Sequence, residues 1–171
     1  MNNRIVIQNI IRFIFLLLIQ LIVLDNITPI TMLMPNVMLI FMIMLPTNTK
    51  HIPMLLIGFA TGLLLDICSN TLGFHCFAFT MTAMARILFA DRILLNNEPI
   101  DIDRPSLRVV NFQHFAIYSL TTLLVYYTTY IIVEAFSFYN VWVMLLSIIA
   151  NVIVTWILLI IYQLALIPEE K

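Results

Sequence analysis

Residues 58–73 read Gly58-Phe59-Ala60-Thr61-Gly62-Leu63-Leu64-Leu65-Asp66-Ile67-Cys68-Ser69-Asn70-Thr71-Leu72-Gly73, and they contain all three glycines of the chain. The first part of this stretch continues an apolar segment that begins at Pro53, and Ser69-Asn70 is typical of a tight turn. A second apolar segment follows directly from Thr71. Two apolar segments joined by a short polar turn are typical of helices that cross a membrane and return.

The composition of the whole chain points to the same class. Hydrophobic residues make up 63% of the 171 residues and charged residues only 10%. A soluble domain is about half apolar and about a quarter charged, and a fold of this size cannot bury so much apolar surface by itself. The composition therefore argues against a soluble enzyme, a nucleic-acid-binding protein and a secreted disulfide scaffold, and it predicts a polytopic membrane protein.

The apolar segments predict a single all-helical domain, residues 1–171, with six membrane spans. A span needs about 20 apolar residues, so the second and third segments are short, and the second could also be re-entrant. A polar cytoplasmic loop, 91–111, separates the fourth and fifth spans and holds most of the charge. The predicted spans are 5–24, 30–45, 53–68, 71–90, 112–133 and 139–162.

The basic residues predict the orientation in the membrane. With six spans, all eight Lys and Arg residues fall on one side, and the opposite loops carry only acidic residues, among them Asp25 and Glu134. The positive-inside rule makes the basic side cytoplasmic, so both termini are expected in the cytoplasm. The basic residues are Arg4, Arg12, Lys50, Arg86, Arg92, Arg104, Arg108 and Lys171.

One face of the third span combines small residues with a carboxylate. Gly58, Gly62, Asp66 and Ser69 fall within about 80° of one another on a helix. The two glycines predict a groove in which another helix backbone can approach closely. A carboxylate at the membrane boundary has two interpretations: a proton or ligand site, or a group that caps or hydrogen-bonds the turn at residues 69–71. The second is the more common arrangement.

This motif resembles the rod shape-determining protein MreD family. The resemblance extends to the chain length, to a first helix marked by Gln20, and to a short second span flanked by prolines. The chain departs from the family at Cys68-Ser69-Asn70-Thr71, where glycine or proline is frequent, and beyond about Phe77 only the hydropathy is similar. The motif residues are Gly58, Phe59, Gly62, Leu65, Asp66, Leu72 and Gly73.

The resemblance implies a multi-pass, non-enzymatic scaffold in the bacterial inner membrane. Its role would be in the cell-elongation machinery, which supports peptidoglycan synthesis and cell shape. The implied partners are MreC, the RodA glycosyltransferase with its penicillin-binding transpeptidase, and indirectly MreB. The implied fold is similar to the substrate-binding subunits of energy-coupling-factor vitamin transporters.

That similarity leaves an alternative open, a substrate-binding subunit of a transporter for a small, vitamin-like molecule. This function would require a cavity lined by Asp66, Asn151 and Tyr126, whereas a centre filled with side chains would favour the scaffold. No paired ligand spacing indicates a metal site, and no pair of residues at membrane depth indicates catalysis. No cofactor and no nucleic-acid partner are expected.

Three further polar residues lie within predicted spans. Arg12 either extends its side chain to the lipid headgroups or pairs within the bundle or with a partner chain. Gln20 lies on the same side of the first span, so this side is expected to face protein. Asn151 lies on a polar stripe of the last span, which predicts hydrogen bonding between helices. Cys68 and Cys76 are expected to be buried, unpaired thiols.

Overall fold

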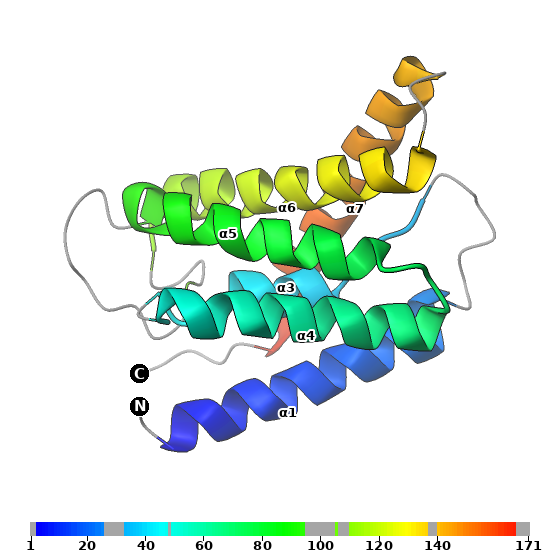
Figure 1. The fold of residues 1–171 in the computed structure, drawn as a ribbon. Helices are drawn as coiled ribbons and strands as arrows, with labels where there is room; N and C mark the ends of the chain where they lie inside the picture. The colour runs from blue at the N-terminus through cyan, green and yellow to red at the C-terminus, as the bar shows by residue number, and fades with distance from the viewer. Residues whose placement is uncertain are drawn as a thin grey trace.

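The computed structural model describes residues 3–25, 33–47, 49–94, 105, 110–136 and 140–166, with side chains described from residue 7 and not for 90–94. Every regular element in these residues is a helix (Figure 1). The helices are α1 (Asn3–Ile19) with its π-helical continuation η1 (Gln20–Leu24), α3 (Met38–Ile43), α4 (His51–Ser69), α5 (Phe74–Leu94), α6 (Phe112–Ala135) and α7 (Val141–Leu166).

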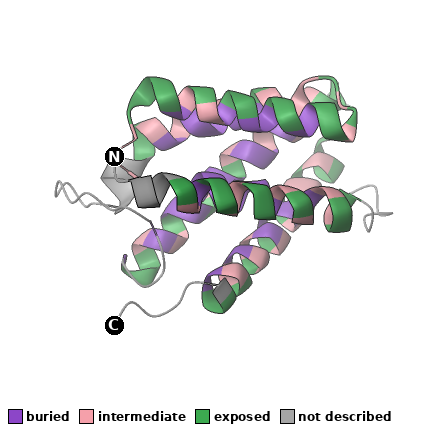
Figure 2. Cartoon of the chain, turned by 90° about the horizontal axis from the view of Figure 1, so that it is seen from below, coloured by how far each residue is buried: buried purple, intermediate pink, exposed green. Residues whose placement is uncertain are grey.

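Four of the described helical segments are long and apolar enough to cross a membrane: Ile7–Leu24, His51–Ser69, Phe112–Ala135 and Val141–Ala165. A shorter apolar stretch in α5, Phe74–Phe89, adds to them. The outward faces carry exposed apolar side chains, while buried residues face the interior (Figure 2). This arrangement is that expected of helices surrounded by lipid, and it agrees with a polytopic membrane protein.

The helices pack in chain order around α3. The helix α4 packs against α5, α5 against α6 and α6 against α7, and α3 contacts both α1 and α6. In Figure 1, α7 is strongly tilted relative to α4, α5 and α6, which run side by side. The short α3 therefore lies inside the bundle.

The second predicted span differs most from its sequence-based expectation. Residues 30–45 were expected to be helical, but in the described part only Met38–Ile43 form a helix, and residues 33–36 have no regular structure. Pro35 explains part of this difference, because a residue before proline avoids the helical region and proline has no N–H to donate. Residues 26–32 lie outside the described part.

The other long helices begin and end within a few residues of the apolar segments predicted from the sequence. The expected loop 91–111 begins later, because the helix α5 continues to Leu94. Most of that loop, 95–104 and 106–109, lies outside the described residues.

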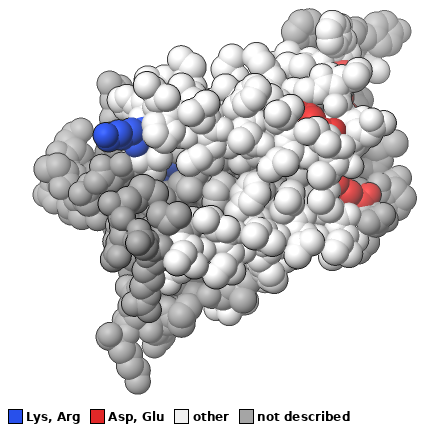
Figure 3. All heavy atoms as spheres, turned by 60° about the horizontal axis from the view of Figure 1, so that its bottom comes forward, with Lys and Arg blue, Asp and Glu red and all other residues white. Residues whose placement is uncertain are grey.

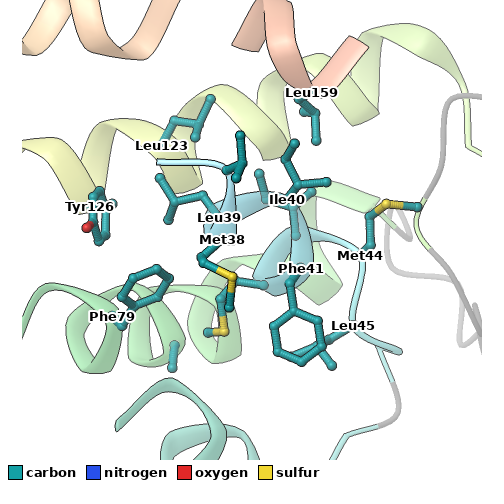
Figure 4. Packing of buried hydrophobic residues seen from close by; sticks show 14 of the residues in the cluster. Met38, Leu39, Ile40, Phe41, Met44, Leu45, Phe79, Leu123, Tyr126 and Leu159 are labelled. Carbon is teal, nitrogen blue, oxygen red and sulfur yellow. The ribbon is translucent and has the colours of Figure 1, made fainter. Parts of the chain in front are cut away.

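The core is centred on α3. All six of its side chains are buried, the most exposed being Phe41 at 6%. Phe79 of α5 and Leu159 of α7 point towards it from the surrounding helices, and Tyr126 of α6 belongs to the same cluster (Figure 4). The interior is thus occupied by a piece of the chain itself.

Charged side chains separate along the molecule. In Figure 3 the basic side chains lie at one end of the visible face and the acidic side chains at the opposite end. The hydrogen bonds show the same separation of charge. Arg12 and Arg86 donate to carbonyl groups just after α3. Asp25 accepts from Ser69 at the end of α4, and Asp66 accepts from Thr71 in the turn that follows. We refer to these as the basic end and the acidic end.

Candidate functional site

The residues around α3, 33–46, form what we call the central segment. A regular span satisfies its backbone groups within its own helix, but a helix of six residues leaves most of its N–H and C=O groups without a helical partner. In a membrane interior these groups cannot turn to water, so each unpaired group is costly. The surrounding side chains must therefore supply the missing hydrogen bonds.

Amide and hydroxyl side chains from three helical elements bind the first half of the central segment. The acceptors are Gln20 on η1, Tyr127 on α6 and Asn151 on α7, so one short stretch is bound by helices far apart in sequence. The backbone N–H groups donate as follows: Met34 to Asn151 Oδ1 at 2.6 Å, Asn36 to the Tyr127 hydroxyl at 2.9 Å and Val37 to Gln20 Oε1 at 2.9 Å.

Donors from α1, α5 and α6 bind the other half of the segment. Four successive carbonyl groups, at residues 43–46, accept from Tyr118, Arg12 and Arg86. The end of a helix carries partial negative charge, so cations are well placed there. The bonds are Tyr118 Oη to the Ile43 carbonyl at 3.2 Å, Arg12 Nη1 to Met44 at 3.4 Å, and Arg86 Nη2 to Leu45 and, at 3.4 Å, to Pro46.

Arg86 is the residue that the sequence interpretation missed. It was counted only among the cytoplasmic basic residues, yet its side chain is 4% exposed. Its Nε donates to the Tyr118 hydroxyl and its Nη1 contacts Met54 Sδ at 3.1 Å. A signal was present, since Arg86 lies between Ala85 and Ile87 in an otherwise apolar helix.

The positive charge of Arg86 is not balanced by a carboxylate among its contacts in the described residues. Removing an ion from water costs several kcal/mol even in real proteins, about 3 or more. A helix C-terminus returns at most about 2 kcal/mol. Hydrogen bonds to a charged group add about 1.5–3 kcal/mol each, so neutral groups, and no described carboxylate, offset the burial of this guanidinium.

An aromatic and amide network connects the first half of the central segment to the acidic end. Asn36 Nδ2 donates to the Tyr126 hydroxyl at 2.8 Å, and that hydroxyl also lies 2.7 Å from His75 Nδ1. The Tyr127 hydroxyl lies 2.5 Å from the hydroxyl of Thr155 on α7. The polar side chains of α7 thus bond to another helix at Thr155, whereas Asn151 bonds to the non-helical part of the central segment.

Asp66 caps the start of α5. Its carboxylate accepts hydrogen bonds from the backbone N–H of His75 at 3.1 Å, from the N–H of Cys76 at 2.8 Å and from the Thr71 hydroxyl. The bond from Thr71 is the contact that the turn interpretation of Asp66 expected. The bonds to α5 add a capping role at a helix that has no other acidic residue in its first turn.

No family model, curated protein or solved structure matches this chain. The functional interpretation therefore rests on the residues and their geometry.

The two glycines of α4 allow α5 to approach closely. A Cβ atom added at Gly62 would lie 2.4 Å from Cys76 Cα, and one at Gly58 would lie 2.8 Å from Ala83 Cβ. Both positions face α5 of the same chain. The groove that the sequence predicted is therefore filled within the bundle.

The remaining motif residues divide into buried and exposed positions. Leu65 is buried, Phe59 is 47% exposed and Leu72 is 90% exposed. Gly73 adopts φ 91°, and its carbonyl accepts the first bond of α5, from Phe77, at 3.1 Å. Leu72 and Phe59 thus do not contribute to the core, whereas Gly73 has a conformational role.

Replacing Gly73 with alanine should destabilise the protein by about 1–2 kcal/mol, because a side chain is strained at this positive φ. No atom lies within 4 Å of the added Cβ, so the loss would come from the backbone alone. The midpoint of thermal unfolding in mild detergent should fall by about 3–6 °C. The control Leu72→Ala, at the exposed neighbour, should leave it within about 1 °C, and an equal fall in both variants would contradict this assignment.

Arg12, Gln20 and Asn151 all bond within the bundle. Gln20 also donates to Asp25 Oδ1 at 2.8 Å, which links the central segment to the acidic end. The interpretation of Arg12 as pairing within the bundle is thus favoured over simple extension to the headgroups.

The expectation for the cysteines was wrong in part, since Cys68 is exposed and Cys76 half-buried, although both are free thiols.

A small cavity of about 90 Å³ lies beside Asn151 near the acidic end. It is lined also by Tyr127, Tyr130 and Glu134. Asp66 and Tyr126, which the transporter alternative placed on the same cavity, are bonded elsewhere, and Tyr126 is buried against the central segment. The polar side chains thus bond to other groups of the chain itself, both backbone and side chain.

Proposed function

We propose that this protein is a non-enzymatic membrane scaffold of the bacterial cell-elongation machinery, related to the MreD family. The observation that carries the proposal is the central segment. The buried helix α3 lies where a substrate-binding subunit would need a cavity, and side chains of α1, α5, α6 and α7 bind the backbone of the central segment on either side of α3. Because the centre of the bundle is filled, the outer faces of its helices are the surfaces left for binding. Such faces can pack against the transmembrane helices of partner proteins.

The outermost helices are the proposed contact surfaces. Only 11% of Ile7–Leu24 is buried inside the bundle, compared with 39% of Phe112–Ala135. Val141–Ala165 is 22% buried and carries the exposed Trp142 at one end. We therefore propose that α1 and α7 present their apolar faces to MreC, to RodA and its transpeptidase, and through these to MreB.

We further propose six crossings with both termini in the cytoplasm of the bacterial inner membrane. The separation of basic and acidic ends supports this orientation, because the positive-inside rule places the basic end in the cytoplasm. The central segment would provide the second crossing as an extended stretch followed by a short helix. Non-helical backbone is tolerated at membrane depth where protein surrounds it. A fold similar to energy-coupling-factor substrate-binding subunits remains part of this proposal.

Affinity purification in mild detergent tests the function. The tagged chain should co-purify MreC and RodA, whereas a tagged membrane protein of unrelated function should not. Recovery of a bound vitamin-like molecule or of an ATPase partner would instead support the transporter alternative. The cavity beside Asn151 is the structural feature that favours this alternative.

Two variants identify the contact surface. Ile11→Trp on α1 and Ile153→Trp on α7 change side chains that are 62% and 51% exposed, so the fold should tolerate both. A bulky residue on a partner contact should reduce MreC or RodA recovery by about tenfold, equivalent to about 1.4 kcal/mol, and leave the yield of the chain unchanged. Full recovery with both variants would exclude these two faces.

A further inference from the structure

A small open cavity lies at the basic end, beside the buried guanidinium of Arg86. Its volume is about 40 Å³, and its lining includes Thr47, Thr49, His51 and Met54. A single water needs about 10–15 Å³ measured in this way, so the cavity has room for a group larger than one water.

Arg86 has donor capacity left on this side. Its Nε and Nη2 donate to oxygen atoms, but the only contact of Nη1 among the described residues is Met54 Sδ at 3.1 Å. Thioether sulfur is a weak acceptor, and Nη1 carries two hydrogens. Within the described residues, the guanidinium that lines the cavity therefore has no carboxylate in contact, and its Nη1 retains a hydrogen that no oxygen accepts.

The surroundings add further positive potential. The helix α4 begins at His51 with no side-chain hydrogen bond at its N-cap, so the positive end of its dipole lies at the cavity. His51 is itself exposed and supplies an imidazole that can donate. A buried cation, an uncapped helix start and a donor at the entrance together favour an anion.

We propose that Arg86 and His51 form a binding site for a phosphate group at the basic end of the bundle. Guanidinium groups match phosphate oxygens in geometry and charge. The site lies where α4 begins, and in the proposed orientation this is the level of the lipid headgroups. The phosphate can therefore belong to a lipid headgroup or be free in solution, and the site itself does not depend on the scaffold function.

Thermal unfolding of the full chain in uncharged detergent tests the site. Inorganic phosphate is titrated at ionic strength held constant with sodium chloride, with acetate as the comparison anion. Phosphate at about a hundredfold excess over its dissociation constant should raise the unfolding midpoint by at least about 5 °C. An equal rise with acetate would show a general effect of anions and would overturn the proposal, unless the lipid of the second arm is bound.

The second arm adds phosphatidylglycerol to the same micelles and counts bound lipid by native mass spectrometry. Stabilisation by the lipid and by inorganic phosphate supports a general phosphate site. Stabilisation by the lipid alone identifies the headgroup as the source, and stabilisation by inorganic phosphate alone identifies a soluble anion. No effect in either arm overturns the proposal.

His51→Glu provides the variant that should still fold, since His51 is exposed and a carboxylate there would pair with Arg86. It should weaken phosphate or lipid binding at least tenfold. The control Lys50→Gln makes the same change in net charge at an exposed neighbour that does not line the cavity, and it should change binding less than threefold. Equal effects of the two variants would show only a general attraction to the basic end.

Discussion

Replacing Gly62 with leucine is expected to prevent accumulation of the folded protein. The added Cβ alone would lie 2.4 Å from Cys76 Cα and 2.5 Å from the His75 carbonyl oxygen. Both are backbone atoms, so no side-chain rotation relieves the clash and α4 must separate from α5. Overpacking typically costs about 1–3 kcal/mol, and a clash against backbone belongs at or above the upper end of that range. The measurement is the yield of monodisperse protein by size-exclusion chromatography in mild detergent.

Ala60→Leu is the matched control for this variant. Ala60 lies on the same helix but is exposed, so the larger side chain should meet lipid or detergent and leave the yield unchanged. Gly62→Ala should already be strongly destabilising. Wild-type yield of Gly62→Leu, together with full recovery of MreC, would contradict both the close packing of α4 on α5 and its role in the proposed complex.

Replacing Asp66 with alanine is expected to have the second largest effect. The carboxylate accepts from the N–H groups of His75 and Cys76 and from the Thr71 hydroxyl, so alanine would leave three donors without their partner. Hydrogen bonds to a charged group contribute about 1.5–3 kcal/mol each, but removing the buried charge recovers part of this. We expect a net loss of about 3 kcal/mol and a fall of about 6–12 °C in the unfolding midpoint in mild detergent.

A graded series separates capping from a ligand-binding role. Thr71→Val removes one of the three donors and should cost about 1 kcal/mol. Asp66→Asn keeps one acceptor oxygen and should lie between Thr71→Val and Asp66→Ala. Normal stability of Asp66→Ala with lost complex formation or lost ligand binding would refute the capping role and restore the alternative site interpretation.

The sequence was most informative where one physical property acted alone. Apolar segments of sufficient length predicted the helices, because a backbone in lipid must bond to itself. The spacing of Gly58 and Gly62 predicted a close helix contact, and the structure identifies α5 as the neighbouring helix. The proximity of Asp66 to the turn at residues 69–71 predicted its hydrogen bond to Thr71.

The sequence was least informative for the central segment. Its residues are as apolar as those of a span, so hydropathy predicted a helix over 30–45, whereas in the described part of that range, 33–45, only Met38–Ile43 are helical. The groups that stabilise this irregular backbone lie far away in the chain, as in the bond between Met34 and Asn151. The buried role of Arg86 was missed for the same reason, since its partners Leu45 and Pro46 are brought to it only by folding.

The sequence by itself therefore determined that this chain is an apolar, all-helical protein. It also predicted a helix contact lined by glycine and a grouping of the basic residues on one side of the predicted spans. Only the tertiary structure decided that one segment fills the centre of the bundle and that a buried arginine binds its end. Hydropathy is a local property that each segment carries alone. The pairing of irregular backbone with distant side chains depends on which helices meet, and that depends on the packing of the whole bundle.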